Sequence, residues 1–373
     1  MRSSSKFVLS VAEVDKRHSF ITVVSVCFCF SALVFTMPLY AAGEIEAWGW
    51  NTYGQCNVPE PNTAFMAIVG GGDFSLGLKQ DGSIVVWGNN DYSQCNVPEP
   101  NMGFKTIAGG AYHSLGLKQD GSIVAWGNNG GGQCNVPEPN TDFKAIAAGG
   151  YHSLGLKTDG SIVAWGNNSK GQCNVPEPNT NFTAIATGWY HSLGLKQDGS
   201  IVAWGDNTYG QCNVPSPNVG FKAIAAGEFH SLGLKQDGSI VTWGDNAYGK
   251  CTVPSPNMDF TAIAGGWFHS LGLKTDGSIV AWGDNTYGQC TVPSPNTGFT
   301  AIAAGFYSSL GLKGCMFNLA GDLNDDCKVD FYDVAILANS WLVHYEMSDL
   351  YTLTTDWLKN CYTNPPDPAC VPK

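Results

Sequence analysis

Apolar and polar residues recur in the same order along most of the chain, with a period of 39 residues. The dipeptide Trp-Gly begins at residues 48, 87, 126, 165, 204, 243 and 282, and successive positions always differ by 39. Each full period holds three short apolar segments typical of strands and no segment with helical spacing. In one period, these segments are the Ala-Ile-Ala run before Gly149, residues 153–157 and residues 161–165.

The segments between these strands predict how the strands pair. Asp-Gly separates the second strand from the third in every full period, and this dipeptide favours the positive φ angles of a tight hairpin. The proline-broken Asn-Val-Pro-Glu-Pro segment is typical of an extended connection rather than of a fourth strand. Each period is therefore expected to form a three-stranded antiparallel sheet. Such a sheet must stack on its neighbours, because it cannot bury both faces alone.

The two ends of the repeat region predict a closed ring. Residues 44–49 supply only a third strand, and residues 299–313 supply only a first and a second strand. Together they complete one sheet, which gives seven sheets in all. We therefore expect an all-β domain over residues 43–313. It should be a seven-bladed β-propeller of three-stranded blades, closed by its N- and C-terminal strands.

The repeat also resembles a known family. The pattern Ala-Ile-Ala-Ala-Gly-x-Tyr-His-Ser-Leu, followed by Asp-Gly-Ser-Ile-Val-Ala-Trp-Gly-x-Asn-x-Tyr-Gly-Gln, is similar to the regulator-of-chromosome-condensation repeat. This resemblance implies a seven-bladed propeller with a shared closing blade. The short period with Gln-Cys-Asn-Val-Pro is especially similar to a secreted bacterial propeller that inhibits β-lactamase. Because this fold hosts exchange factors, inhibitors and scaffolds, the resemblance alone does not specify a function.

The segment before the repeats is expected to direct export. Lys16, Arg17 and His18 precede an apolar run over residues 20–35, and residues 40–42 offer small residues for cleavage. We interpret residues 1–42 as a signal peptide, with a retained membrane anchor as the alternative. In both cases we expect the propeller to be secreted or associated with the cell surface.

The charge of the chain narrows the choice of partner. Its 373 residues carry a net charge of −12, and arginine occurs only at Arg2 and Arg17. A nucleic-acid binder needs clustered Arg and Lys to displace counterions and to grip phosphate. Nucleic acid is therefore not expected as a partner, and we expect a monomer that binds a protein.

The repeated His, Trp and Cys residues are expected to be structural. Five histidines share one repeat position, and Phe74 and Ser308 occupy it in the other two periods, so the position tolerates residues that bind no metal. We expect hydrogen-bonded histidines in the core, tryptophans between blades, and buried free thiols too far apart for disulfides. No catalytic triad or singular carboxylate pair stands out, so we do not expect an enzyme. The histidines are His113, His152, His191, His230 and His269, and the cysteines are Cys56, Cys95, Cys134, Cys173, Cys212, Cys251 and Cys290.

After Lys313 the repeat stops, and residues 314–373 are expected to form a separate module. Oxygen-bearing side chains stand there at loop positions 1, 3, 5, 9 and 12, and position 7 can offer its backbone carbonyl. Hard oxygen donors at this spacing favour Ca²⁺. An apolar helix is expected next, over residues 334–342, and the alternative is an acidic loop without metal. The candidate ligands are Asp322, Asn324, Asp326, Lys328, Asp330 and Asp333.

This loop and helix resemble one half of a type I dockerin, which implies calcium-dependent docking onto a cohesin-like domain. Loop position 6, usually Gly, is Cys327. Positions 10 and 11, where partner specificity lies in that family, are Phe331 and Tyr332, which we include among the candidate partner-binding residues. Residues 349–358 repeat the helix but lack a ligand series, so we expect one calcium ion. Four cysteines of this module fit two disulfides with three possible connectivities: Cys315, Cys327, Cys361 and Cys370.

Variation within the repeat predicts a binding face. In each antiparallel sheet, the connection between the first two strands emerges at the same end as the exit from the third strand. The Asp-Gly hairpins at the opposite end scarcely vary, whereas one position at this end does: Gly72, Ala111, Gly150, Trp189, Glu228, Trp267 and Phe306. Clustered exposed aromatics are typical of binding hot spots. The alternative is that these aromatics pack against neighbouring blades. The candidate partner-binding residues of the propeller are therefore Trp50, Trp189, Glu228, Trp267 and Phe306.

These observations favour an exported, non-catalytic recognition propeller that is tethered to a surface or extracellular assembly through its calcium-binding module. Two other classes of function stay open. One is a protein inhibitor of a secreted or periplasmic hydrolase. The other is a carbohydrate-binding or carbohydrate-cleaving propeller.

Overall fold

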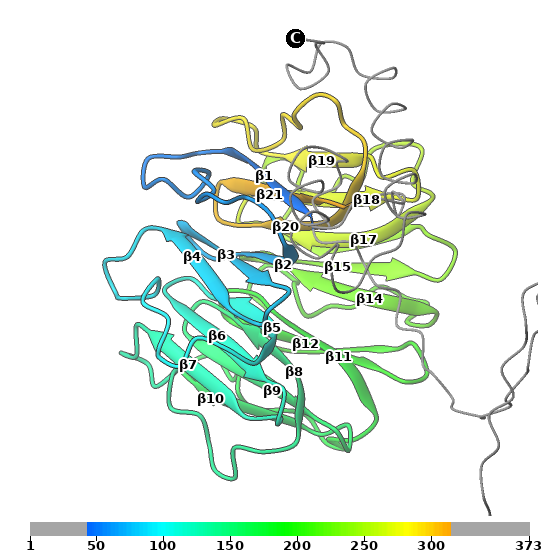
Figure 1. Ribbon diagram of the computed structural model, residues 1–373. Helices are drawn as coiled ribbons and strands as arrows, with labels where there is room; N and C mark the ends of the chain where they lie inside the picture. Colours follow the sequence, from blue (N-terminus) through cyan, green and yellow to red (C-terminus); the bar gives the residue numbers. More distant parts are fainter. Residues whose placement is uncertain (1–42, 315–373) are drawn as a thin grey trace, which may run out of the picture. The chain divides into compact units, whose positions relative to one another are not determined.

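The structure is a computed structural model that describes residues 43–314, and these residues form seven three-stranded antiparallel sheets (Figure 1). Besides strands, this range contains one short 3₁₀ turn, Ala247–Gly249 (η1). The predicted all-β class and the three-stranded blades are confirmed. The predicted signal peptide lies outside the described residues. The predicted calcium ligands, Phe331, Tyr332 and the four cysteines of the C-terminal module also lie outside them.

Each blade takes one strand of each of three kinds, and the middle strand pairs with the other two. The first strands are β2 Phe65–Gly70, β5 Phe104–Gly109, β8 Phe143–Ala148, β11 Phe182–Thr187, β14 Phe221–Ala226, β17 Phe260–Gly265 and β20 Phe299–Ala304. The middle strands are β3 Phe74–Lys79, β6 His113–Lys118, β9 His152–Lys157, β12 His191–Lys196, β15 His230–Lys235, β18 His269–Lys274 and β21 Ser308–Lys313. The third strands are β4 Ile84–Gly88, β7 Ile123–Gly127, β10 Ile162–Gly166, β13 Ile201–Gly205, β16 Ile240–Gly244, β19 Ile279–Gly283 and β1 Glu44–Gly49.

The seven blades surround a central channel of about 320 Å³, which is lined by residues of all seven first strands. The ring closes as predicted, because the N-terminal strand β1 pairs with β21 along its whole length, from Glu44 opposite Lys313 to Gly49 opposite Ser308. An ion pair reinforces this seam, with Lys313 Nζ 2.5 Å from Glu46 Oε1. One blade is therefore built from the two ends of the repeat region.

The core lies between neighbouring blades rather than within any one sheet. In one interface, Leu115 and Ile123 of one blade pack with Phe143 and Trp165 of the next. The middle strand leaves room for the phenylalanine ring, since a Cβ at Gly155 would lie 2.4 Å from an edge carbon of Phe143. This close approach explains the repeated Leu-Gly-Leu sequence. The predicted packing of the repeat tryptophans between blades is confirmed.

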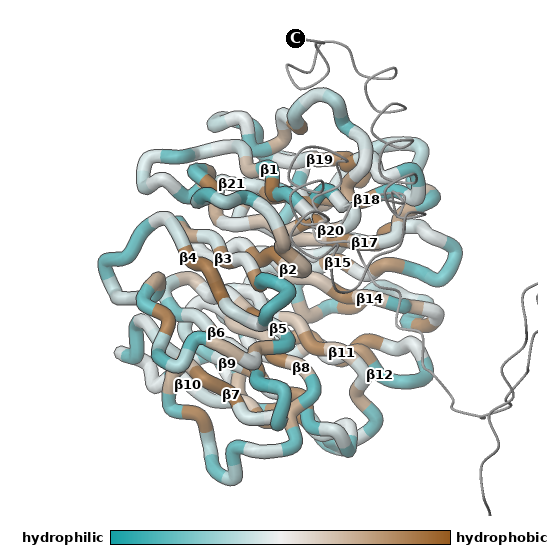
Figure 2. The backbone as a smooth tube through the Cα atoms, in the orientation of Figure 1, coloured by the Kyte–Doolittle hydropathy of each residue, from teal (hydrophilic) through white to brown (hydrophobic). Residues whose placement is uncertain are grey.

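Hydropathy follows this architecture, with apolar segments along the strands and polar segments at the turns (Figure 2). Within residues 43–314, no helix is long and apolar enough to cross a membrane.

Candidate functional site

Two connections of every blade emerge at one end of the ring, which we call the loop face. In the first complete blade, β2 ends at Gly70 and β4 ends at Gly88. The N–H of Asn89, after β4, donates to the carbonyl of Asp73, before β3, at 2.8 Å. The prediction that these connections share one end is confirmed. With their equivalents at steps of 39, the residues of the loop face are 49–57 and 70–74.

A cavity of about 170 Å³ opens at the centre of the loop face, and residues from all seven blades line it. Most of its wall is glycine and alanine. Four larger side chains complete the lining: Trp189, Glu228, Trp267 and Phe306. The structure therefore brings together four of the five candidate partner-binding residues of the propeller.

The three aromatic rings at this cavity stack on one another. The ring centroid of Trp267 lies 4.0 Å from that of Phe306 and 5.1 Å from that of Trp189, at interplanar angles of 24° and 20°. Phe306 is only 9% exposed, whereas both tryptophans are half-buried. Packing between blades therefore describes Phe306, and its predicted exposure is wrong. Trp189 and Trp267 keep accessible surface.

Trp50, the fifth candidate, is not among the residues that line the cavity. Its ring stacks on Tyr287, with centroids 5.4 Å apart, and meets Tyr307 edge-on at 5.5 Å. Tyr307 in turn lies 5.8 Å from Trp267. A continuous aromatic network thus joins Trp50 to the cavity.

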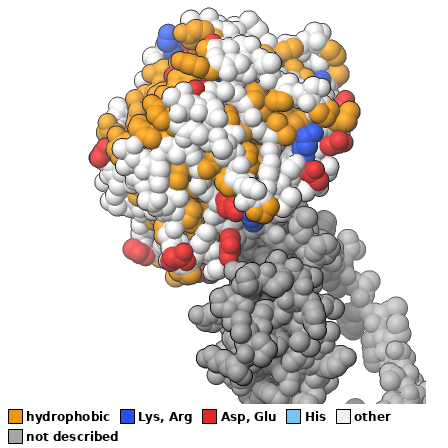
Figure 3. Space-filling view, turned by 90° about the horizontal axis from the view of Figure 1, so that it is seen from above, with side chains coloured by type: hydrophobic (Ala, Val, Ile, Leu, Met, Phe, Trp, Pro, Cys, Tyr) orange, Lys and Arg blue, Asp and Glu red, His pale blue; other side chains and the backbone are white. Residues whose placement is uncertain are grey.

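Exposed tyrosines extend this network over the loop face. They occupy one repeat position in five consecutive blades and are between 47% and 66% exposed, whereas Gly131 and Lys170 take that position in the other two blades. We call this set the tyrosine crescent: Tyr209, Tyr248, Tyr287, Tyr53 and Tyr92. In a space-filling view, apolar side chains spread across the visible surface and charged groups gather toward its edges (Figure 3).

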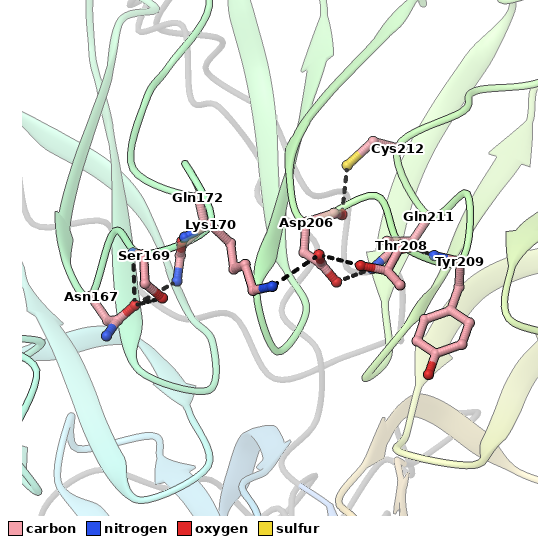
Figure 4. Close-up of polar contacts among 9 residues, drawn as sticks. All are labelled: Asn167, Ser169, Lys170, Gln172, Asp206, Thr208, Tyr209, Gln211 and Cys212. Atoms are coloured by element: carbon pink, nitrogen blue, oxygen red, sulfur yellow. Dashed lines mark hydrogen bonds and ion pairs between the residues drawn. The ribbon is translucent and has the colours of Figure 1, made fainter.

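The loops of this face are held in place by buried polar side chains (Figure 4). Nε2 of Gln172 donates to Oδ1 of Asn167 at 3.1 Å, and in the next blade Nε2 of Gln211 donates to Oδ2 of Asp206 at 2.9 Å. Lys170 reaches from one blade to the other, with Nζ 3.9 Å from Asp206 Oδ1. The glutamine contact recurs in three further blades, from Gln94 to Asn89, from Gln133 to Asn128 and from Gln289 to Asp284, and it orders these loops.

Two carboxylates of the loop face, Asp73 and Glu228, have neither a cation within ion-pairing distance nor a side-chain amide donor among the described residues. Asp73 occupies the repeat position that carries Tyr or Phe in the other six blades, and its buried Oδ1 lacks a hydrogen-bond partner within residues 43–314. Burial raises the pKa of Asp73 to about 6. Burial also raises the pKa of Glu228 to about 7, against smaller lowering effects of the Trp267 indole N–H and of Lys250.

The repeated histidines lie in the interfaces between blades, next to the glycines that line the cavity. All five are fully buried, and each ring nitrogen Nε2 lies 2.9 Å from a serine Oγ of the next blade. The prediction that they are hydrogen-bonded core residues is confirmed. In the part of the chain that the structure describes, no group of three or more His, Cys, Asp or Glu residues is arranged to hold a metal ion.

Comparison with known proteins accounts for the repeat. A family profile described as "Regulator of chromosome condensation (RCC1) repeat" matches residues 67–94, 104–133, 143–172, 182–211, 221–250 and 260–289. The chain carries RCC1-type repeats. A search of curated proteins finds no match.

Solved structures show the same fold as this RCC1-type propeller. Prp20p from Saccharomyces cerevisiae, described with its binding to Gsp1p and histones, superposes with a TM-score of 0.63 at 18% identity, covering 81% of this chain and 96% of its own. The same yeast protein bound to Kap60 has a TM-score of 0.63 at 17% identity, covering 88% and 99%. The ectodomain of the Arabidopsis thaliana receptor kinase ACR4 has a TM-score of 0.52 at 26% identity, covering 65% and 91%.

The repeat cysteines of this RCC1-type propeller are free, as predicted, but they are half-buried rather than fully buried. Each thiol donates to a backbone carbonyl of its own loop, for example from Cys212 Sγ to the Asp206 oxygen at 3.2 Å. Burial raises the pKa of this thiol to about 12. Each cysteine therefore contributes a hydrogen bond to its loop, and its thiol is protonated at neutral pH.

Sequence reasoning missed Asp73 and the tyrosine crescent. Asp73 could have been found as the one acid at an otherwise aromatic repeat position. The tyrosine of the crescent recurs at one repeat position in the sequence. Because candidate binding residues were chosen by variation between repeats, this recurrent tyrosine was not selected. That these tyrosines face solvent is known only from the exposed fraction of each ring in the structure.

Proposed function

We propose that this RCC1-type propeller is an exported, non-catalytic recognition protein that binds a protein partner with its loop face. The observation that carries the proposal is the tyrosine crescent beside the aromatic cavity, with five tyrosines that each expose about half or more of their surface. Tyr and Trp are enriched among the residues that dominate the binding energy of protein interfaces. Exposed aromatic patches of this kind are rare on monomers that bind nothing.

Similar propellers support a protein as the ligand class. Yeast Prp20p is described with its binding to Gsp1p and histones and in a complex with Kap60. The ACR4 propeller belongs to the ectodomain of a receptor kinase, so a propeller of this type can work outside the cell. Export of the present chain is inferred from residues 1–42, and its tether is inferred from the calcium-loop sequence at residues 322–333.

The resemblance of the short repeat to the β-lactamase-inhibiting propeller adds one partner class, a secreted or periplasmic hydrolase. Binding at the loop face would then block the active site of that hydrolase. The tethered recognition protein and the inhibitor predict the same contact surface. They differ in whether the bound partner loses activity.

The test compares two double variants of the full chain. Tyr209→Ala with Tyr248→Ala removes rings that are 53% and 66% exposed, and Met102→Ala with Val219→Ala removes side chains of similar exposure outside the loop face, 63% and 58%. A partner is first captured from culture medium with the parent protein, then purified and titrated. We expect the tyrosine variant to weaken the Kd by at least about tenfold and the control by less than about twofold.

Thermal melting of both variants checks that they are folded. Equal affinity of the tyrosine variant and the parent would show that the crescent is not the contact surface. If no protein is captured, and the parent binds a glycan array that the tyrosine variant does not bind, the ligand is a carbohydrate and not a protein.

A further inference from the structure

Lysines are unequally distributed over the propeller, and few of them lie on the loop face. Among the described residues, the loop face holds two lysines, Lys170 and Lys250. The other ten lysines belong to strands and turns outside this face. The carboxylates of the loop face are Asp73, Asp91, Asp206, Glu228, Asp245 and Asp284. The surface that carries the tyrosine crescent therefore holds six acids and two lysines.

Both lysines of the loop face are already paired. Lys250 Nζ lies 2.6 Å from Asp245 Oδ2, and Lys170 Nζ lies 3.9 Å from Asp206 Oδ1. The negative charge of the remaining four acids is therefore not balanced by a lysine of this face.

Two of those four acids have side-chain amide donors. Asn89 Nδ2 donates to Asp91 at 2.8 Å, and Gln289 Nε2 donates to Asp284 at 3.0 Å. Asp73 has no such donor among the described residues, and its Oδ1 is buried. Glu228 and Asp73 are consequently the carboxylates that a ligand could still complement.

Glu228 lines the aromatic cavity together with Trp189 and Trp267. The indole nitrogen of Trp267 is buried and lies outside hydrogen-bonding geometry with any described acceptor, although it is close enough to lower the pKa of Glu228. A carboxylate next to two half-buried tryptophan side chains is an arrangement that attracts a cation, through charge and through cation–π contact.

Asp73 belongs to another blade but lies close to the cavity, because the N–H of Phe306 donates to the carbonyl of Gly72, the residue before Asp73, at 3.0 Å. Tyr307, which contacts Trp267, has its pKa raised to about 12 by burial first and then by neighbouring groups that include both Glu228 and Asp73. Both carboxylates therefore act on the surroundings of one phenol next to the cavity.

We propose that the cavity of the loop face receives a basic side chain, lysine or arginine, of the partner protein. Glu228 is the direct acceptor, the accessible parts of Trp189 and Trp267 contact the aliphatic part and the cation, and Asp73 adds negative potential. The inference rests on the proposed function, because it takes the basic residue to belong to the captured protein.

The state of Glu228 gives this site a pH dependence. The groups that face it are the Trp267 indole, Lys250, Asp245 and Tyr307, and burial is the largest cause of its raised pKa of about 7. Below that pH the carboxyl is neutral, so a cation gains little. Binding of a basic ligand should strengthen as the pH rises through about 7.

The probe is a fluorescein-labelled hexalysine peptide, titrated into the full chain by fluorescence anisotropy at near-physiological salt (~0.15 M). We expect Glu228→Gln to weaken the Kd by about tenfold or more and Asp73→Asn to weaken it by a smaller factor. The matched control is Asp276→Asn, an exposed acid of a hairpin turn, which should change the Kd by less than about twofold. Gln has the shape of the neutral form of Glu228, so the Glu228→Gln variant should fold. Circular dichroism checks that it does.

Hexalysine acetylated on every side chain should not bind. Unchanged affinity of Glu228→Gln, equal binding of the acetylated peptide, or an equal loss in Asp276→Asn would each overturn the inference. The hexalysine titration contains no natural partner, so its failure would leave the proposed function, which the tyrosine variants test, unaffected. Unchanged partner affinity in the tyrosine variant would instead overturn the proposed function.

Discussion

His113 donates a hydrogen bond from Nε2 to Oγ of Ser153 in the neighbouring blade, at 2.9 Å. The direction follows from the serine, because its own proton is given to the carbonyl of Gln133, also at 2.9 Å. Serine can then only accept, so the imidazole carries its proton on Nε2 and is neutral. The same carbonyl accepts the indole N–H of Trp165 at 2.8 Å. Four more interfaces repeat this contact, from His152, His191, His230 and His269.

These buried histidines predict acid lability. Burial lowers the pKa of His113 to about 3 and that of His191 to about 4, from the usual histidine value of 6.5. The folded state thus binds fewer protons than the unfolded state, so the stabilisation is present above pH 6.5 and is lost as the pH falls toward the folded pKa. His191→Phe copies the residue that Phe74 supplies in another blade, and it removes one such titration.

We expect the unfolding free energy of His191→Phe to fall less steeply below pH 6.5 than that of the parent, by up to about 1.4 kcal/mol per pH unit. Urea unfolding between neutral pH and about pH 4.5 measures this slope. His191→Gln, which cannot become charged, should show the same gain. Asp73 and Glu228 titrate with the opposite sign in this range, but they are common to all three proteins and cancel. An unchanged slope would mean that the histidine is already charged or exposed.

A second prediction concerns the interface that closes the ring. Ser308 holds the histidine position of the closing blade, and its buried Oγ has no hydrogen-bond partner within residues 43–314. In the neighbouring blade, Ser75 Oγ donates to the Gln55 carbonyl at 2.9 Å and can still accept a hydrogen bond. Ser308→His should supply the missing donor and raise the unfolding free energy by about 1 kcal/mol at pH 7.5. Ser308→Phe fills the same space without a donor, so a gain equal to that of histidine would refute the role of the hydrogen bond.

Much of this architecture follows from local sequence rules, whereas the site does not. Three short apolar segments and the Asp-Gly turn predict the three strands of each blade, and the split between Glu44–Gly49 and Phe299–Lys313 predicts the closure. The site depends on contacts across the ring. Tyr112, for example, lies 6.2 Å from Trp189 and 6.3 Å from Phe306, which belong to different blades. A repeat gives the place of a residue in its blade but not how far its side chain reaches over the centre. Asp73 was therefore missed, and the sequence left open whether Phe306 is exposed or packed.

A third prediction concerns the repeat cysteines. Burial raises the pKa of Cys56 and Cys95 to about 11, so few thiolates exist at neutral pH. Native protein should react with iodoacetamide roughly 100-fold more slowly than a free thiol, and urea should remove the difference. Peptide mapping after alkylation should find all seven repeat cysteines labelled. A disulfide between any two of them would contradict the geometry of the blades.

The last prediction addresses the C-terminal module, whose calcium loop is a sequence-based expectation. One ligand series, beginning at Asp322, and one copy without a series predict a single calcium ion for the full chain. Isothermal titration with Ca²⁺ should give a stoichiometry near one, and Asp322→Ala should abolish binding because position 1 of the loop supplies a charged ligand. Asp349→Ala changes the matching acid of the second copy and should leave the stoichiometry unchanged. A stoichiometry of two would show that the second copy binds calcium through ligands outside the predicted spacing, and no heat above the Asp322→Ala baseline would leave an acidic loop without metal.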